Sequence, residues 1–128
     1  MAHTMLGTRW VRIAGWLVVA LGAIHIAATP LVYPTHAGDD LTFLYMFLAT
    51  GVAVIFAGLV VLFAARGWQR GERWAWAILL RTGVFLLLLG VGAVITMADN
   101  PFAYVMLILA VVAALPVWVY RKEFLEGK

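Results

Sequence analysis

The sequence predicts an all-α membrane protein, a bundle of four transmembrane helices. Of its 128 residues, 66% are hydrophobic, and the mean hydropathy of +1.03 is too high for a soluble domain. Apolar residues fall into four runs without a charged side chain, Ile13–Gly38, Leu41–Ala65, Thr82–Ala98 and Asn100–Tyr120. Because each span needs roughly 20 residues, residues 1–128 are expected to form a single transmembrane domain.

The charged residues predict how these spans are oriented. The basic side chains lie before the first run, between the second and third runs, or after the fourth: Arg9, Arg12, Arg66, Arg70, Arg73, Arg81, Arg121, Lys122 and Lys128. The other two connections contain only Asp39, Asp40 and Asp99. Because Lys and Arg mark cytoplasmic loops, we expect both termini in the cytoplasm and the protein in a bacterial-type inner membrane. Topology and anionic membrane lipid account for the basic residues, so no nucleic-acid binding is expected.

The first two spans are expected over residues 10–29 and 41–65. The apolar stretch Ile13–Ala28 is longer than the core of a typical signal peptide, so we expect this span to be retained. The connection between the two spans contains two prolines and ends at Asp40, which is placed to cap the second helix.

The third and fourth spans are expected over residues 74–97 and 101–120. The polar turn Arg66–Arg73, with two glycines, precedes the third span. Asn100 is expected to end that segment, and Pro101 suits the first turn of the next helix. Since this connection is very short, the third and fourth spans must be antiparallel neighbours.

Tryptophan residues and one proline lie toward the predicted cytoplasmic side. Pro116 leaves the carbonyl of Val112 without its helical amide, so we expect a kink in the fourth span. The tryptophans are interpreted as interfacial anchors; they are Trp10, Trp16, Trp68, Trp74, Trp76 and Trp118.

Small residues recur seven positions apart in every span. The pairs are Gly15 and Gly22, Gly51 and Gly58, Gly83 and Gly90, and Ala103 and Ala110. Seven residues make nearly two helical turns, so each pair lies on one face. Small faces let helices approach closely in lipid, and we expect them to face inward. The first and third spans also share their order of small and large residues, which indicates two helical hairpins related by parallel duplication.

His25 is the strongest candidate for a functional residue. It lies about four residues, or roughly 6 Å, from the outer end of the first span and about 60° from the small face. An ionisable residue inside a span is a functional-site hypothesis by default. The alternative is structural: the imidazole hydrogen-bonds a carbonyl or Thr29 and holds helices together.

Other residues near the outer end complete the candidate site. A carboxylate near a histidine is sufficient for general acid–base chemistry, which makes His25 and Asp99 the candidate catalytic pair; the alternative for Asp99 is a solvated or helix-capping residue. Histidine with thioethers can ligate Cu(I) or form half of a haem axial pair. Methionine is equally a core filler, so no metal site and no cofactor is assigned. The expected ligand-contacting residues are Thr29, Tyr33, Tyr45, Thr96, Met97 and Met106.

Short motifs occur along three of the spans. They are His25 followed by Thr29-Pro30, the glycines of the second span, and the hexapeptide Gly71–Trp76 that opens the third. Together they resemble small DoxX-like bacterial membrane proteins, and the resemblance covers most of the chain. It implies a four-helix fold and, for some members, a role as accessory subunit of a membrane oxidoreductase; it transfers no catalytic residue. The chain lacks the cysteines of vitamin K epoxide reductase-type bundles and the embedded glutamate of small multidrug-resistance exporters.

Three functions remain open from the sequence. The first is an accessory subunit or lipophilic-ligand binder with an outward-side polar pocket around His25, surrounded by membrane lipid and assembled as a homo-oligomer or larger membrane complex. The second is a membrane-embedded isomerase or hydrolase for a lipophilic substrate. It requires His25 and Asp99 within hydrogen-bond or one-water reach at a cavity of roughly 300 Å³ or more. The third is a redox subunit with haem at His25.

Overall fold

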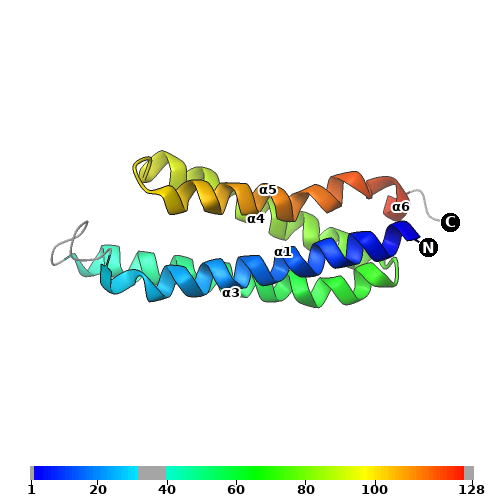
Figure 1. The fold of residues 1–128 in the computed structure, drawn as a ribbon, viewed down its shortest axis with the longest axis horizontal. Helices are drawn as coiled ribbons and strands as arrows, with labels where there is room; N and C mark the ends of the chain where they lie inside the picture. Colours follow the sequence, from blue (N-terminus) through cyan, green and yellow to red (C-terminus); the bar gives the residue numbers. More distant parts are fainter. Residues whose placement is uncertain (1, 32–39, 126–128) are drawn as a thin grey trace.

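The computed structural model describes residues 2–31 and 40–125, which form a bundle of helices (Figure 1). Its helices are α1 (Ala2–Ala27), α3 (Leu41–Gln69), α4 (Arg73–Thr96), α5 (Pro101–Val119) and the short α6 (Arg121–Leu125). Four helical segments are long and apolar enough to cross a bilayer, so the chain is a small integral membrane protein. The prediction of an all-α bundle of four transmembrane helices is confirmed.

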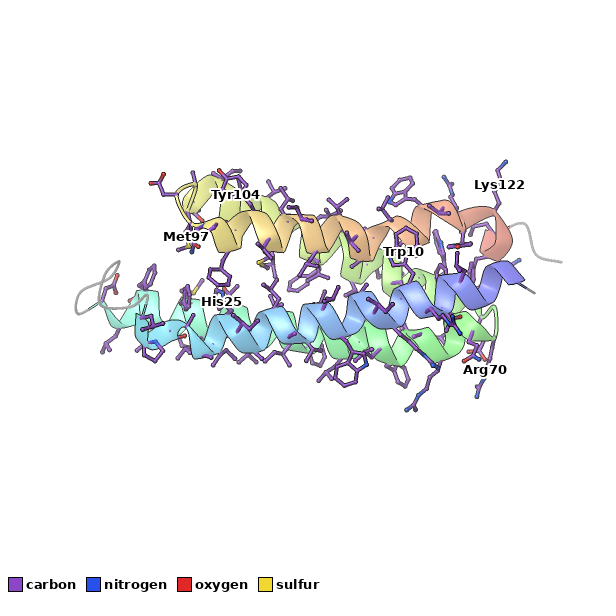
Figure 2. The ribbon with its side chains drawn as sticks, viewed as in Figure 1. Trp10, His25, Arg70, Met97, Tyr104 and Lys122 are labelled. Carbon is purple, nitrogen blue, oxygen red and sulfur yellow. The ribbon has the colours of Figure 1, made fainter. Side chains whose placement is uncertain are left out.

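The helices are arranged as two antiparallel hairpins, α1 with α3 and α4 with α5 (Figure 1). The hairpins lie close together at the end of the bundle that holds α6 and the start of α1, which we call the α6 end. They diverge toward the opposite end, where His25 and Met97 lie (Figure 2), and which we call the His25 end.

Glycines make the closest contacts inside each hairpin. A Cβ added at Gly22 of α1 would lie 2.8 Å from both the Gly51 carbonyl oxygen and the Ile55 amide nitrogen of α3. In the second hairpin, a Cβ added at Gly90 of α4 would lie 2.9 Å from the Cα of Leu107 in α5. The small faces that were expected to face inward therefore pack each helix against its hairpin partner, where backbone-to-backbone approach is needed most.

Side chains cap the starts of α3 and α5 at the His25 end; the Asp40 cap was predicted, whereas Asn100 was expected only to end the preceding helix. Asp40 accepts hydrogen bonds from the amides of Thr42, at 2.9 Å, and Phe43, at 3.4 Å. Asn100 accepts one from the amide of Phe102 at 3.0 Å. Each cap satisfies amides at a helix start that have no helical partner, so α3 and α5 begin at fixed positions beside His25.

An aromatic cluster closes the α6 end. Trp68 of α3 is only 1% exposed, and its ring lies 4.3 Å from that of Phe124 and edge-on to that of Tyr120, at 6.0 Å. This corrects the interpretation of Trp68 as an interfacial anchor, because the end of α5 and α6 fold over it. Trp16 and Trp118 are 62% and 64% exposed, which agrees with anchoring in the interface.

The carbonyls around Pro116 of α5 are bonded to tryptophans of other helices. Trp10 Nε1 of α1 donates to the Val112 carbonyl oxygen at 3.1 Å, which is the carbonyl that the proline leaves without its helical amide. Trp76 Nε1 of α4 donates to the carbonyl oxygen of Val117, also at 3.1 Å. The proline therefore exposes an acceptor that joins α1 to α5, and thus one hairpin to the other.

Replacing Trp10 with phenylalanine is expected to lower the free energy of unfolding by about 1–3 kcal/mol. The phenyl ring keeps most of the apolar contact but leaves the Val112 carbonyl without a donor. The matched control is Trp16→Phe, the same change at an exposed site of the same helix. Thermal unfolding of both variants in detergent micelles measures the difference; equal midpoints would show that the Trp10 hydrogen bond does not join the hairpins.

Candidate functional site

A cavity of about 450 Å³ lies between the two hairpins at the His25 end. All four long helices contribute to its wall, and Figure 2 shows His25 and Met97 on opposite hairpins at this end. Most of the wall is apolar, with three aromatic rings and three thioethers: Phe43, Phe47, Phe102, Met46, Met97 and Met106. The volume is sufficient for a small-molecule site, for which roughly 300 Å³ is a lower limit.

His25 is held in this wall by α3. Its Nε2 lies 3.0 Å from the Phe47 carbonyl oxygen, and its imidazole stacks on the Phe47 ring with centroids 3.9 Å apart and 20° between the planes. Gly51 provides the space, since a Cβ added there would lie 3.1 Å from His25 Cδ2. The structural role considered for His25, a hydrogen bond to a carbonyl between helices, is therefore present.

The hydrogen bond also defines which nitrogen of His25 carries a proton. A carbonyl oxygen can only accept, so Nε2 is the donor, and Nδ1 of the neutral ring is an acceptor. Nε2 and Cδ2 form the edge that faces α3, which leaves Nδ1 on the opposite edge. Within residues 2–31 and 40–125, no hydrogen bond to Nδ1 is present.

The other polar side chains of the wall are already hydrogen-bonded within their own segments. The hydroxyls of Thr50 and Thr96 each donate to a carbonyl of their own helix at 2.8 Å. Oδ1 of Asn100 accepts from the Phe102 amide, which leaves its NH₂ group as a donor. No Asp, Glu, Lys or Arg of the described chain lines the cavity. The described part of the cavity wall therefore carries no formal charge. His25 contributes an imidazole whose Nδ1 has no hydrogen-bond partner among the described residues.

No family model, curated protein or solved structure matches this chain. Its function must therefore be inferred from the chemistry of the cavity.

The structure brings part of the predicted site together. The cavity wall includes His25, Thr96, Met97 and Met106. Thr29 is buried and donates to the backbone carbonyl of His25 at 3.4 Å, which places its hydroxyl on the helix rather than in the cavity. Tyr45 is 70% exposed on another face of α3. Tyr33 lies outside the described residues.

Asp99 is not part of the cavity wall. It is exposed in the turn between α4 and α5, and the adjacent residue, Asn100, lines the cavity instead. The hydrogen bonds of His25 within the described chain go to Phe47 and Thr29, not to Asp99. The isomerase or hydrolase alternative therefore has a cavity of adequate volume, but residues 2–31 and 40–125 place no carboxylate beside the imidazole.

The haem and copper alternatives depend on His25 as a ligand. Its Nε2 is engaged by Phe47, so only Nδ1 remains for a metal. The described residues contain no group of three or more His, Cys, Asp or Glu side chains that could hold a metal ion. Met97 and Met106 remain as possible thioether ligands at the same cavity, and no observation favours that role over packing.

The residues predicted for the site did not include the phenylalanines of the cavity wall or Gly92. Phe43, Phe47 and Gly51 are four residues apart, so they share one face of α3. This spacing could have predicted that Gly51 and the two phenylalanines form one face of α3 against His25.

Proposed function

We propose that this membrane protein binds a lipophilic small molecule in the cavity between its hairpins. The observation that supports the proposal is the cavity of about 450 Å³, with phenylalanine and methionine walls and the imidazole of His25 among its described lining residues. Apolar pockets with a few convergent polar groups are the usual form of small-molecule sites. Methionine side chains can adjust to ligands of different shape, so the pocket suits a hydrophobic guest taken from the bilayer.

The charge distribution supports a proposed orientation for this site. Exposed cations gather at the α6 end, where Arg70 and Lys122 lie (Figure 2), while Asp40 and Asp99 lie at the His25 end. By the positive-inside rule, the α6 end faces the cytoplasm of a bacterial-type cell and the cavity lies near the outer surface. We also propose that the protein assembles as a homo-oligomer or within a larger membrane complex. An accessory-subunit role, which the DoxX-like resemblance implies for some members, is compatible with ligand binding in the cavity.

Gly92 allows the cavity to be filled without disturbing the helices. It lines the cavity, and a Cβ added there would meet no atom within 4 Å. We expect Gly92→Phe to weaken binding of the neutral fluorescent probe N-phenyl-1-naphthylamine by about tenfold or more, which corresponds to about 1.4 kcal/mol. Fluorescence titration of the protein in nanodiscs, with empty nanodiscs as background, measures this change.

The matched control is Val91→Phe, which adds the same ring at the neighbouring, exposed position of α4. It should leave probe affinity unchanged. Equal losses in the two variants, or no loss in Gly92→Phe, would show that the probe binds elsewhere and would contradict the proposed function.

A further inference from the structure

The hydrogen-bonding pattern of the cavity defines the chemistry of its ligand more closely. We propose that the cavity selects a neutral lipophilic phenol or alcohol whose hydroxyl group donates a hydrogen bond to Nδ1 of His25. This inference rests on the proposed ligand-binding function and specifies the class of molecule bound.

The fixed orientation of the His25 imidazole is the first observation that supports a hydroxyl ligand. Rotating the His25 ring by half a turn would place a carbon, Cε1, against the Phe47 carbonyl oxygen and lose the 3.0 Å hydrogen bond. Stacking on Phe47 fixes the plane of the ring, and Gly51 accommodates its Cδ2 edge. Nδ1 is therefore held as an acceptor on the edge away from α3, and a ligand must bring a donor to satisfy it.

The second supporting observation is that no carboxylate, ammonium or guanidinium group of the described residues lines the cavity. Because no Asp, Glu, Lys or Arg of the described residues lines the cavity and the His25 ring is neutral when Nδ1 accepts, an ionised ligand would lose hydration without gaining a counter-charge there. A hydroxyl group is neutral and both donates and accepts. It can donate to Nδ1 of His25 while its oxygen accepts from a group such as the NH₂ of Asn100, whose Oδ1 is already bonded.

The third supporting observation is the row of aromatic rings in the cavity wall. Phe43 stacks on Phe47 with centroids 5.8 Å apart, and Phe47 stacks on His25, so three rings follow one another along the cavity. Such a wall favours an aromatic guest, and the thioethers of Met97 and Met106 make favourable contacts with aromatic rings. A phenol can both pack its ring against these aromatic side chains and donate a hydrogen bond to Nδ1 of His25.

A pair of probes that differ in one donor tests the inference. The affinities of 4-octylphenol and its methyl ether, 4-octylanisole, are measured by titration calorimetry in nanodiscs and corrected for partition into empty nanodiscs. We expect the phenol to bind about tenfold more tightly, because the ether leaves Nδ1 unpaired. The corresponding carboxylate, 4-octylbenzoate, should bind more weakly than the phenol.

Two variants connect the preference to His25. In His25→Phe the phenol and the ether should bind equally. In His25→Gln the preference should return, since the amide can donate to the Phe47 carbonyl and still present an acceptor oxygen. Thermal unfolding shows whether each variant is folded. The comparison of phenol and ether on the unaltered protein tests the inference even if a variant does not fold.

The outcomes separate the two proposals. Equal affinities of phenol and ether for the unaltered protein would overturn the hydroxyl inference but leave the cavity as a lipophilic site. Tightest binding of the benzoate would also overturn it, because His25 would then be acting as a donor or a cation. Failure of all three probes and of N-phenyl-1-naphthylamine would overturn both proposals.

Discussion

Replacing Trp68 with alanine is expected to lower the free energy of unfolding by about 3–5 kcal/mol. The indole is almost fully buried and in contact with the rings of Tyr120 and Phe124. The start of α1 packs on it as well, since a Cβ added at Gly7 would lie 3.0 Å from Trp68 Nε1. Removing the ring opens a void between α1, α3, α5 and α6 that no flexible side chain is placed to fill.

The control for this prediction is Trp118→Ala, which truncates a largely exposed indole at the same end of the bundle. Its effect on unfolding should be small, because the ring has few protein contacts to lose. Thermal or denaturant unfolding in one detergent compares the two variants. Similar losses would mean that Trp68 contributes to stability as a general interfacial residue and not as the centre of an aromatic cluster.

Gly22→Ala is expected to lower the free energy of unfolding by about 1–3 kcal/mol. The added methyl would lie 2.8 Å from the Gly51 carbonyl oxygen and the Ile55 amide nitrogen, so backbone and not a flexible side chain must move. Separation of α1 from α3 would also lengthen the contact between His25 and Phe47, so ligand affinity should fall together with stability.

Gly92→Ala provides the comparison, because its methyl would meet open space and alanine favours the helix. Its unfolding midpoint should be unchanged or slightly higher. If Gly22→Ala were as stable as Gly92→Ala, the close approach of α1 and α3 would not be a determinant of the fold.

The parts of the structure that the sequence predicted depend on local properties of the chain. Apolar runs as long as a bilayer is thick predict spanning helices wherever they occur. The cap at Asp40 was predictable because a capping side chain bonds to amides only two or three residues away. The cap at Asn100 is equally local, although it was not predicted. The free carbonyl of Val112 follows in the same way from Pro116 four residues later.

The features that escaped prediction depend on which helices pack together. Nothing near Val112 in the sequence shows that Trp10, 102 residues earlier, provides its donor. The burial of Trp68 likewise requires α6 to fold over it. At the candidate site, one position in a tight turn decides that Asn100 and not Asp99 lines the cavity, and periodicity does not specify the geometry of such a turn.

The pairing of His25 with Phe47 has a consequence for how the protein is made. Both residues belong to the first hairpin, and chains emerge from the ribosome with the N-terminal segment first. The imidazole can therefore meet its acceptor as soon as α3 packs on α1 in the bilayer, before α4 and α5 have packed against the first hairpin. The imidazole of His25 is therefore hydrogen-bonded in lipid without the second hairpin. Packing of the second hairpin encloses the cavity and is not needed to satisfy Nε2 of the histidine.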